Sequence, residues 1–182
     1  MTSPMVPDEK DWTWVLDRPC PDCGFEASDH PRERLGVGIR RVALRWRPLL
    51  DRPLATERPR PDQWSALEYG AHVRDVFTTC LGRLEKMLSE DDPTFLNWDQ
   101  DATAVEDDYA GQDPFEVARQ LESNAIAFAD AYDRVEDTDW ARTGMRSDGA
   151  RFTVESFGRY GLHDPVHHVW DVEQGYAALE GR

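Results

Sequence analysis

Apolar residues recur at three- and four-residue steps in four separate stretches of the chain, which is the spacing of one face of an α-helix. The clearest pattern is that of Phe115, Ala118, Leu121, Ala125, Phe128, Tyr132 and Val135. Asp113 is suited to cap this helix, and Pro114 fits its first turn. The sequence therefore predicts an amphipathic helix over residues 114–135.

A second pattern predicts a helix over residues 65–89. Ser65 and Glu68 have the spacing of a capping box, which marks its start. Its apolar stripe contains Tyr69, His72, Val73, Val76, Cys80, Leu84 and Met87. His72 is therefore expected to point into the protein, whereas Cys80 is interpreted as a packing residue. Gly70 leaves room for a close approach to His72.

A third helix is expected from about Pro31 to Trp46, with Asp29 as a possible cap. Prolines, beginning with Pro48, predict an irregular connection after it. Its arginines are Arg32, Arg34, Arg40, Arg41, Arg45 and Arg47. We expect them to form a solvated face paired with acids elsewhere, while one or two could instead reach a carboxylate substrate.

The last helix is expected to begin near Thr153 and to end between Gly175 and Leu179. Pro165 lies in its middle, where it removes one backbone hydrogen bond. The helix is therefore either kinked but continuous, or broken, with Asp164 capping a new helix that starts at Pro165.

Together these patterns predict an all-α fold, a four-helix bundle (residues 32–182) preceded by an irregular N-terminal arm (residues 1–31). The acidic segment 90–113 is expected to be a long solvated loop, and a further hypothesis is that it covers a metal pocket with Trp98 as its anchor. It lacks the glycine and the final glutamate of a calcium-binding EF-hand loop. The segment 136–149 is rich in turn residues and could hold a small hairpin.

The charge of the chain limits its partners. The 182 residues carry a formal net charge of −15 and a pI near 4.6, which argues against nucleic acid and anionic membranes. The length suits one domain.

The start, residues 1–10, does not resemble a signal sequence, and no apolar run is long enough for a membrane helix. We expect a cytoplasmic protein.

Three of the five histidines lie close together, at His163, His167 and His168. On a helix, His163 and His167 share one face, which suits two imidazoles binding one metal ion. A metal site needs at least a third ligand, and the inward-facing His72 is the best candidate. His168 lies about 100° around the helix from His167, so it is less suited to bind the same metal.

The cysteines leave several interpretations open. Their odd number, three, disfavours a disulfide framework. Cys20 and Cys23 form a C-x-x-C turn, which can be half of a zinc site, a redox pair, or a thiol-bearing turn in a reducing compartment. Completing a zinc site would require His30 or Asp29 and a further group.

A histidine on the second helix with H-x-x-x-H on the last helix resembles the DinB-like superfamily, which includes mycothiol- and bacillithiol-dependent transferases and isomerases. The resemblance covers about residues 34–176. It implies a four-helix bundle and a divalent metal, zinc or nickel, bound by His72, His163 and His167 with open positions for water or a thiol such as mycothiol. It also favours a continuous, kinked last helix.

Three acids are candidates to hold the metal-binding imidazoles through their second nitrogen. Glu68 lies one turn before His72, and Asp171 lies one turn after His167. Asp164 is considered as a capping residue, as an outer acceptor or as a fourth metal ligand.

Three functions follow from the resemblance and the expected metal. The first is a metal- and thiol-dependent S-transferase or isomerase that acts on a small electrophile. The second is a hydrolase that uses the same three histidines. The third is a stress-linked bundle that binds metal or a small molecule without turnover, plausibly as a homodimer.

Overall fold

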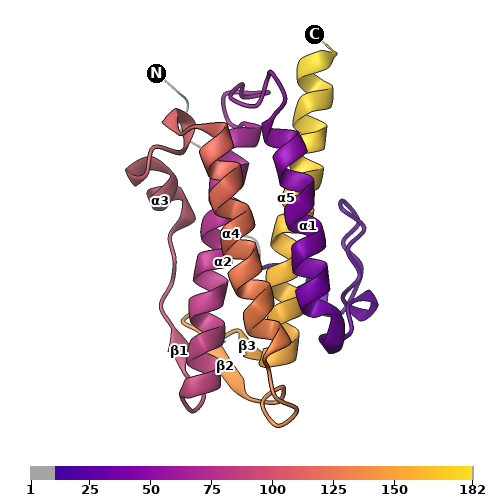
Figure 1. Cartoon of the computed structure of the whole chain (residues 1–182), viewed down its shortest axis with the longest axis vertical. Helices are drawn as coiled ribbons and strands as arrows, with labels where there is room; N and C mark the ends of the chain where they lie inside the picture. The colour runs from indigo at the N-terminus through magenta and orange to yellow at the C-terminus, as the bar shows by residue number, and fades with distance from the viewer. Residues whose placement is uncertain (1–10, 182) are drawn as a thin grey trace.

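The computed structural model describes residues 11–181 and contains four long helices that pack as a bundle (Figure 1). These are α1 (Leu35–Leu50), α2 (Ala66–Ser89), α4 (Pro114–Asp133) and α5 (Val154–Glu180). Both α1 and α2 pack against α4 and α5. The expected all-α four-helix bundle is confirmed. The first ten residues of the expected arm lie outside the described part of the chain.

Side-chain caps fix where three of these helices begin. Ser65 and Glu68 form the expected capping box of α2. Asp113 accepts a hydrogen bond from the backbone of Glu116 at 2.9 Å and so caps α4, as predicted. α5 begins with a second capping box, in which Thr153 pairs with Ser156. Each cap satisfies backbone donors that the first turn leaves free.

The structure corrects both ends of the first expected helix. Residues Arg32–Arg34 form a 3₁₀ turn, and α1 begins only after it. Asp29 does not cap α1, because it lies in a separate 3₁₀ turn. Pro48 does not end the helix but lies in its last turn. It removes a single backbone donor, and burial of Leu49 and Leu50 holds the turn in place.

α5 is a single helix that passes through Pro165. The alternative in which Asp164 caps a new helix is therefore wrong. The carbonyl of Gly161 loses its usual donor at this proline. Gly161 also allows α5 to lie close to α2, since a Cβ atom there would lie 3.3 Å from the Cys80 sulfur.

The segments between the long helices contain more structure than the sequence predicted. The expected hairpin is present as β2 (Thr143–Arg146) and β3 (Arg151–Thr153), which are antiparallel. The segment 90–113 is not a plain loop: it contains β1 (Thr94–Phe95), which pairs parallel to β2, and the short helices α3 (Gln100–Glu106) and η4 (Tyr109–Gly111). The small sheet lies at the lower end of the bundle in Figure 1.

The described part of the N-terminal arm is held against α5. It contains only short 3₁₀ turns, including η1 (Trp12–Leu16) and η2 (Ala27–Asp29). Both turns contact α5. Residues 11–31 of the arm contain no helix longer than these turns and no strand.

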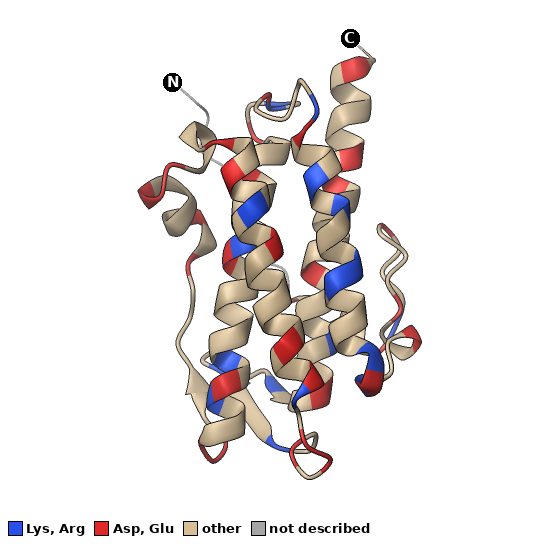
Figure 2. Ribbon diagram, in the orientation of Figure 1, with Lys and Arg blue, Asp and Glu red and all other residues tan. Residues whose placement is uncertain are grey.

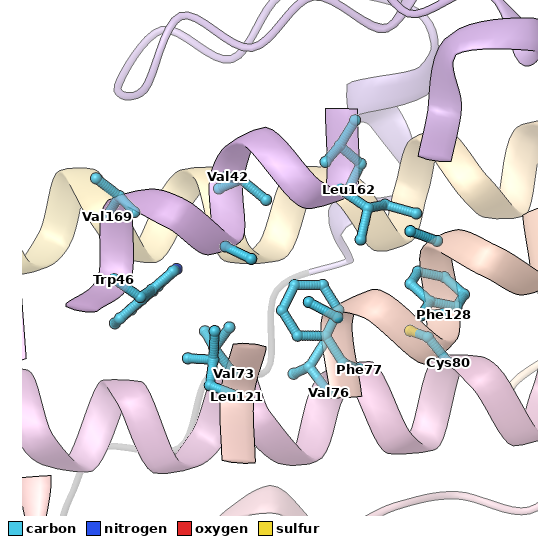
Figure 3. Close-up of a cluster of buried hydrophobic side chains, with 14 of the residues drawn as sticks. Val42, Trp46, Val73, Val76, Phe77, Cys80, Leu121, Phe128, Leu162 and Val169 are labelled. Carbon is cyan, nitrogen blue, oxygen red and sulfur yellow. The ribbon is translucent and has the colours of Figure 1, made fainter. Parts of the chain in front are cut away.

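The core lies between the four long helices, and Figure 3 shows its central side chains. Trp46 from α1, Phe77 from α2 and Phe128 from α4 are fully buried there. Phe115 was expected on the same apolar face as Phe128, but it is 63% exposed. It lies in the first turn of α4, where the guanidinium of Arg47 covers its ring.

Three arginines of α1, Arg40, Arg45 and Arg47, pair with acids on the neighbouring helices, which agrees with part of the prediction. Arg40 pairs with Asp130 and Asp133 on α4, and Arg45 pairs with Glu173 on α5 at 3.0 Å. In the ribbon of Figure 2, basic positions are spaced along α1 and acidic positions along α4 and α5. Among the described helices, none is both long and apolar enough to cross a membrane.

Replacing Phe128 with alanine should destabilise the bundle much more than replacing Phe115. Phe128 is fully buried, so Phe128→Ala should lower the free energy of unfolding by about 3–5 kcal/mol. Phe115→Ala is the matched control on the same helix and should change it by less than about 1 kcal/mol. Urea denaturation followed by circular dichroism measures both values. Equal losses would contradict this placement of the core.

The buried carboxylate of Glu68 should make stability depend on pH. Burial raises its pKa, but hydrogen bonds from Arg58 and Ser65 lower it further, to below the usual 4.5. Ionised Glu68 therefore stabilises the fold above about pH 4.5, and this contribution is lost as the pH falls through its folded pKa. Glu68→Gln should lower the free energy of unfolding by about 1–3 kcal/mol at neutral pH. The difference from the wild type, measured by urea denaturation, should narrow in acid; a constant difference would refute this role.

Candidate metal sites in the cavity and beneath the arm

Four positions within six consecutive residues of α5 carry two pairs of potential metal ligands. His163 and His167 form one pair, and Asp164 and His168 form the other. Each pair has the four-residue spacing that places two side chains on one face of a helix. Because the pairs are offset by one residue, they face directions about 100° apart. The structure gives each pair different partners.

The pair of Asp164 and His168 meets His72 from α2, and these three residues are called the cavity group here. The Oδ1 atom of Asp164 lies 3.6 Å from Nε2 of His72 and 3.7 Å from Nε2 of His168. Within the described residues, this buried oxygen has no hydrogen-bond partner. The separations are close to the roughly 3.4 Å expected between two oxygen or nitrogen ligands of one tetrahedral metal ion.

Charge and hydrogen bonding suit the cavity group to a cation. Burial raises the pKa of Asp164, but His168, His72 and His163 lower it further, so that the carboxyl is ionised well below neutral pH. His168 contacts Asp171 through Nδ1, at 2.8 Å from Oδ2. This contact leaves Nε2 of His168 turned toward Asp164, in the manner of carboxylates that orient metal-binding histidines.

Asp164 and His168 line a cavity of about 1080 Å³ between α2, α5 and the segment 90–113, and so do His163 and His167. His72 is buried and does not itself line the cavity. Trp98 from that segment lines the cavity and stacks on His72, with ring centroids 5.5 Å apart and an interplanar angle of 3°. Trp64 packs on His72 as well, at 5.3 Å. The segment 90–113 thus forms part of the cavity wall, and Trp98 is its contact with His72.

The pair of His163 and His167 faces the N-terminal arm and meets Cys20 and Cys23; these four residues are called the arm group here. Their ligand atoms all lie within 4.8 Å of one another. Sγ of Cys20 lies 3.6 Å from Nδ1 of His167. Cys20, His163 and His167 are buried, and Cys23 is half-buried.

Burial also controls the protonation of the arm group. It lowers the pKa of His163 to about 4, with a smaller contribution from His167, and it lowers the pKa of His167. Both imidazoles are therefore neutral at pH 7, the form that binds metals. Burial raises the pKa of the Cys23 thiol to about 12, so this thiol is protonated in the absence of a metal.

The structure divides the expected trio of His72, His163 and His167. Neither group contains all three: His72 belongs to the cavity group, and His163 and His167 belong to the arm group. Two overlapping pairs with the same spacing occur in the sequence, and the rotation of α5 about its axis decides which pair faces α2. The signal for the second pair was Asp164, four residues before His168.

The expected supporting acids are also distributed differently. The carboxylate of Glu68 accepts hydrogen bonds from Ser65 and Arg58, and within the described residues Nδ1 of His72 has no hydrogen-bond partner. Asp171 contacts His168 directly and lies 3.8 Å from Nε2 of His167.

The partners of Cys20 and Cys23 were not foreseen either. His30 and Asp29 were the candidates to complete a site with the two cysteines, but neither belongs to the arm group. His30 stacks on Phe25 instead, with ring centroids 4.8 Å apart. No pattern in the sequence indicates that the C-x-x-C turn would meet a helix more than 140 residues away.

Comparison with known proteins agrees with this fold. YfiT from Bacillus subtilis, described as a probable metal-dependent hydrolase with an unusual four-helix bundle topology, has a similar structure, with a TM-score of 0.74. The match has 16% sequence identity and covers 82% of this chain and 87% of YfiT. No protein of curated function matches the sequence. The family model of the DinB superfamily matches residues 39–172, and the chain therefore belongs to the DinB superfamily.

Proposed function

We propose that the protein is a metal-dependent hydrolase in which His72, Asp164 and His168 bind a divalent cation such as zinc or nickel. The observation that carries this proposal is the buried Oδ1 atom of Asp164. It faces two imidazole nitrogens at 3.6 and 3.7 Å, too far for hydrogen bonds, and has no other partner among the described residues. A shared cation satisfies all three groups at once.

The ligand set favours hydrolysis. Two histidines and one carboxylate are the protein ligands of hydrolytic zinc in thermolysin and carboxypeptidase. Three protein ligands leave a coordination position free, and the cavity gives a substrate access to it. A cation bound there would lower the pKa of a water molecule or a thiol that reaches the free position and would polarise a carbonyl.

The surrounding residues have separate roles in this proposal. Asp171 orients His168 through Nδ1. Trp98 and Trp64 pack on His72 and keep water away from it. Polar groups, among them Arg60 and Arg83, line the cavity further out and are placed to contact a polar substrate.

The similarity to YfiT supports the proposal, because YfiT is described as a probable metal-dependent hydrolase and has the same fold. Membership of the DinB superfamily is consistent with it. The substrate bond is an ester or an amide in this proposal.

A second candidate is the metal- and thiol-dependent transfer or isomerisation that the family resemblance suggested. The cavity favours it through its size, since about 1080 Å³ matches the upper end of the range for ligand pockets, roughly 300–1,000 Å³. Such a volume accommodates a thiol cofactor such as mycothiol together with a small electrophile. The same free coordination position would then be used by sulfur instead of water.

Removing any cavity-group ligand should abolish hydrolysis. His72→Ala, Asp164→Ala and His168→Ala should each lower the turnover of a panel of esters and amides by about 100-fold or more, since even outer-shell changes lose roughly 10–100-fold. His30→Ala is the matched control, because His30 lies in neither group, and it should keep full turnover. Assays use metal-loaded protein. Undiminished turnover in the three variants would rule out this site.

Added thiol should distinguish the two candidate reactions. If the protein is a hydrolase, products form without thiol at a rate that mycothiol or a simpler thiol does not change. If it is a transferase, turnover requires thiol, and mass spectrometry detects a thioether product in a one-to-one ratio with consumed thiol. The wild type and His72→Ala are compared in both assays. Thiol dependence that persists in His72→Ala would disconnect the reaction from the cavity group.

A further inference from the structure

We propose that the arm group is a second, structural zinc site, in which Cys20, Cys23, His163 and His167 fasten the N-terminal arm to α5. This inference does not depend on the proposed hydrolase function, because the two groups share no ligand.

The distances fit a single tetrahedral ion. Zinc–sulfur bonds of about 2.3 Å and zinc–nitrogen bonds of about 2.0–2.1 Å place a sulfur and a nitrogen ligand roughly 3.6 Å apart. Sγ of Cys20 and Nδ1 of His167 are 3.6 Å apart. All four ligand atoms lie within 4.8 Å of one another, so that small side-chain rotations bring them to a common ion.

The number and kind of ligands indicate a structural role. Two thiolates and two imidazoles are a common closed set for zinc, with no position left for a substrate. The cavity group differs in both respects, since it has three ligands and no sulfur. Binding of zinc would release the thiol protons of Cys20 and Cys23 to solvent.

The turn that carries the cysteines is formed by its own backbone. The amide of Cys20 donates to the carbonyl of Phe25, and the amide of Gly24 donates to the carbonyl of Cys20, both at 2.9 Å. Gly24 has a φ of +72°, a conformation that glycine adopts without steric strain. The turn thus brings both thiols to the same side, toward α5.

The surroundings of the histidines independently point to a ligand. His163 is 3% exposed, and its Nε2 has no hydrogen-bond partner among the described residues. Trp12 packs on His163 and His167, with ring centroids 5.3 and 4.8 Å away, and Phe25 packs on His163 from another side. A buried ring nitrogen without a partner is unfavourable, and coordination of zinc removes that penalty.

A metal also explains how the arm is held. The described part of the arm contains only 3₁₀ turns of three to five residues, although Phe25 and Ala27 are buried against the core. Small irregular segments are often stabilised by metal coordination in place of a hydrophobic core. Zinc between Cys20, Cys23 and α5 gives the arm one strong attachment point.

Metal content and cobalt spectra of the full chain test this site. The wild type, purified without an affinity tag, should hold two metal ions per chain, whereas Cys20→Ser/Cys23→Ser should hold one. Cobalt-loaded wild type should show sulfur-to-cobalt charge-transfer absorption in the near ultraviolet, and the double variant should lose it. Cys80→Ala is the matched control: it removes the remaining thiol, which lies in neither group, and should keep both the ion and the absorption.

Hydrogen–deuterium exchange tests the attachment of the arm without relying on metal content. In the double variant, and in the wild type after chelation, peptides covering residues 11–31 should exchange roughly tenfold faster. Peptides from α4 should be unchanged, which shows that the bundle remains folded.

The outcomes separate this inference from the proposed hydrolase. His72→Ala should lose the ion of the cavity group but keep the sulfur-to-cobalt absorption. The arm-group site can therefore be tested even if the cavity group binds no metal. A folded double variant with the same metal content and cobalt spectrum as the wild type would overturn the arm-group site. A Cys20–Cys23 disulfide, detected by mass in protein handled without oxidant, together with no zinc uptake after reduction, would also overturn it.

Discussion

The helical geometry of α5 directs two pairs of candidate ligands toward different neighbours, although the pairs are offset by only one residue in the sequence. Each residue of an α-helix turns about 100° from the one before, so a shift of one position moves a pair of side chains from one neighbour to another. Asp164 and His168 meet α2, and His163 and His167 meet the arm. Both groups depend on α5 remaining one continuous helix from Val154 to Glu180.

Two features help α5 to stay continuous over these positions despite Pro165. The proline removes one hydrogen bond inside the helix, but Leu162 and Val169 on either side are buried in the core. Gly161 brings the same turn close to Cys80 on α2. Tertiary packing thus holds the helix where its local sequence is weakest, which explains why local rules alone left its continuity open.

Local signals in the sequence were sufficient for most of the bundle. Capping residues such as Ser65 and Asp113 act within one turn, so they mark the starts of α2 and α4 without knowledge of the fold. The inward direction of His72 followed from its apolar stripe and is confirmed by its burial. Errors arose at Asp29 and Pro48, where packing against other elements outweighed the local preference.

The distribution of the histidines needed information that a single sequence does not carry. Asp164/His168 and His163/His167 have the same spacing, and a rotation of α5 by about 100° would exchange the pair that faces α2. The partners of Cys20 come from the far end of the chain, and no local preference encodes such a contact. Residue types and spacings therefore predicted candidate metal ligands on α5, while their division into two groups required the packed structure.

Asp171 links the two groups through a single carboxylate. Its Oδ2 lies 2.8 Å from Nδ1 of His168 and 3.8 Å from Nε2 of His167. All of these residues belong to α5, so a rotation of the helix moves both groups together. Fastening the arm to His163 and His167 therefore also restrains the rotation of Asp164 and His168. The irregular arm thereby influences the positions of the cavity-group side chains on α5. None of its described residues belongs to that group.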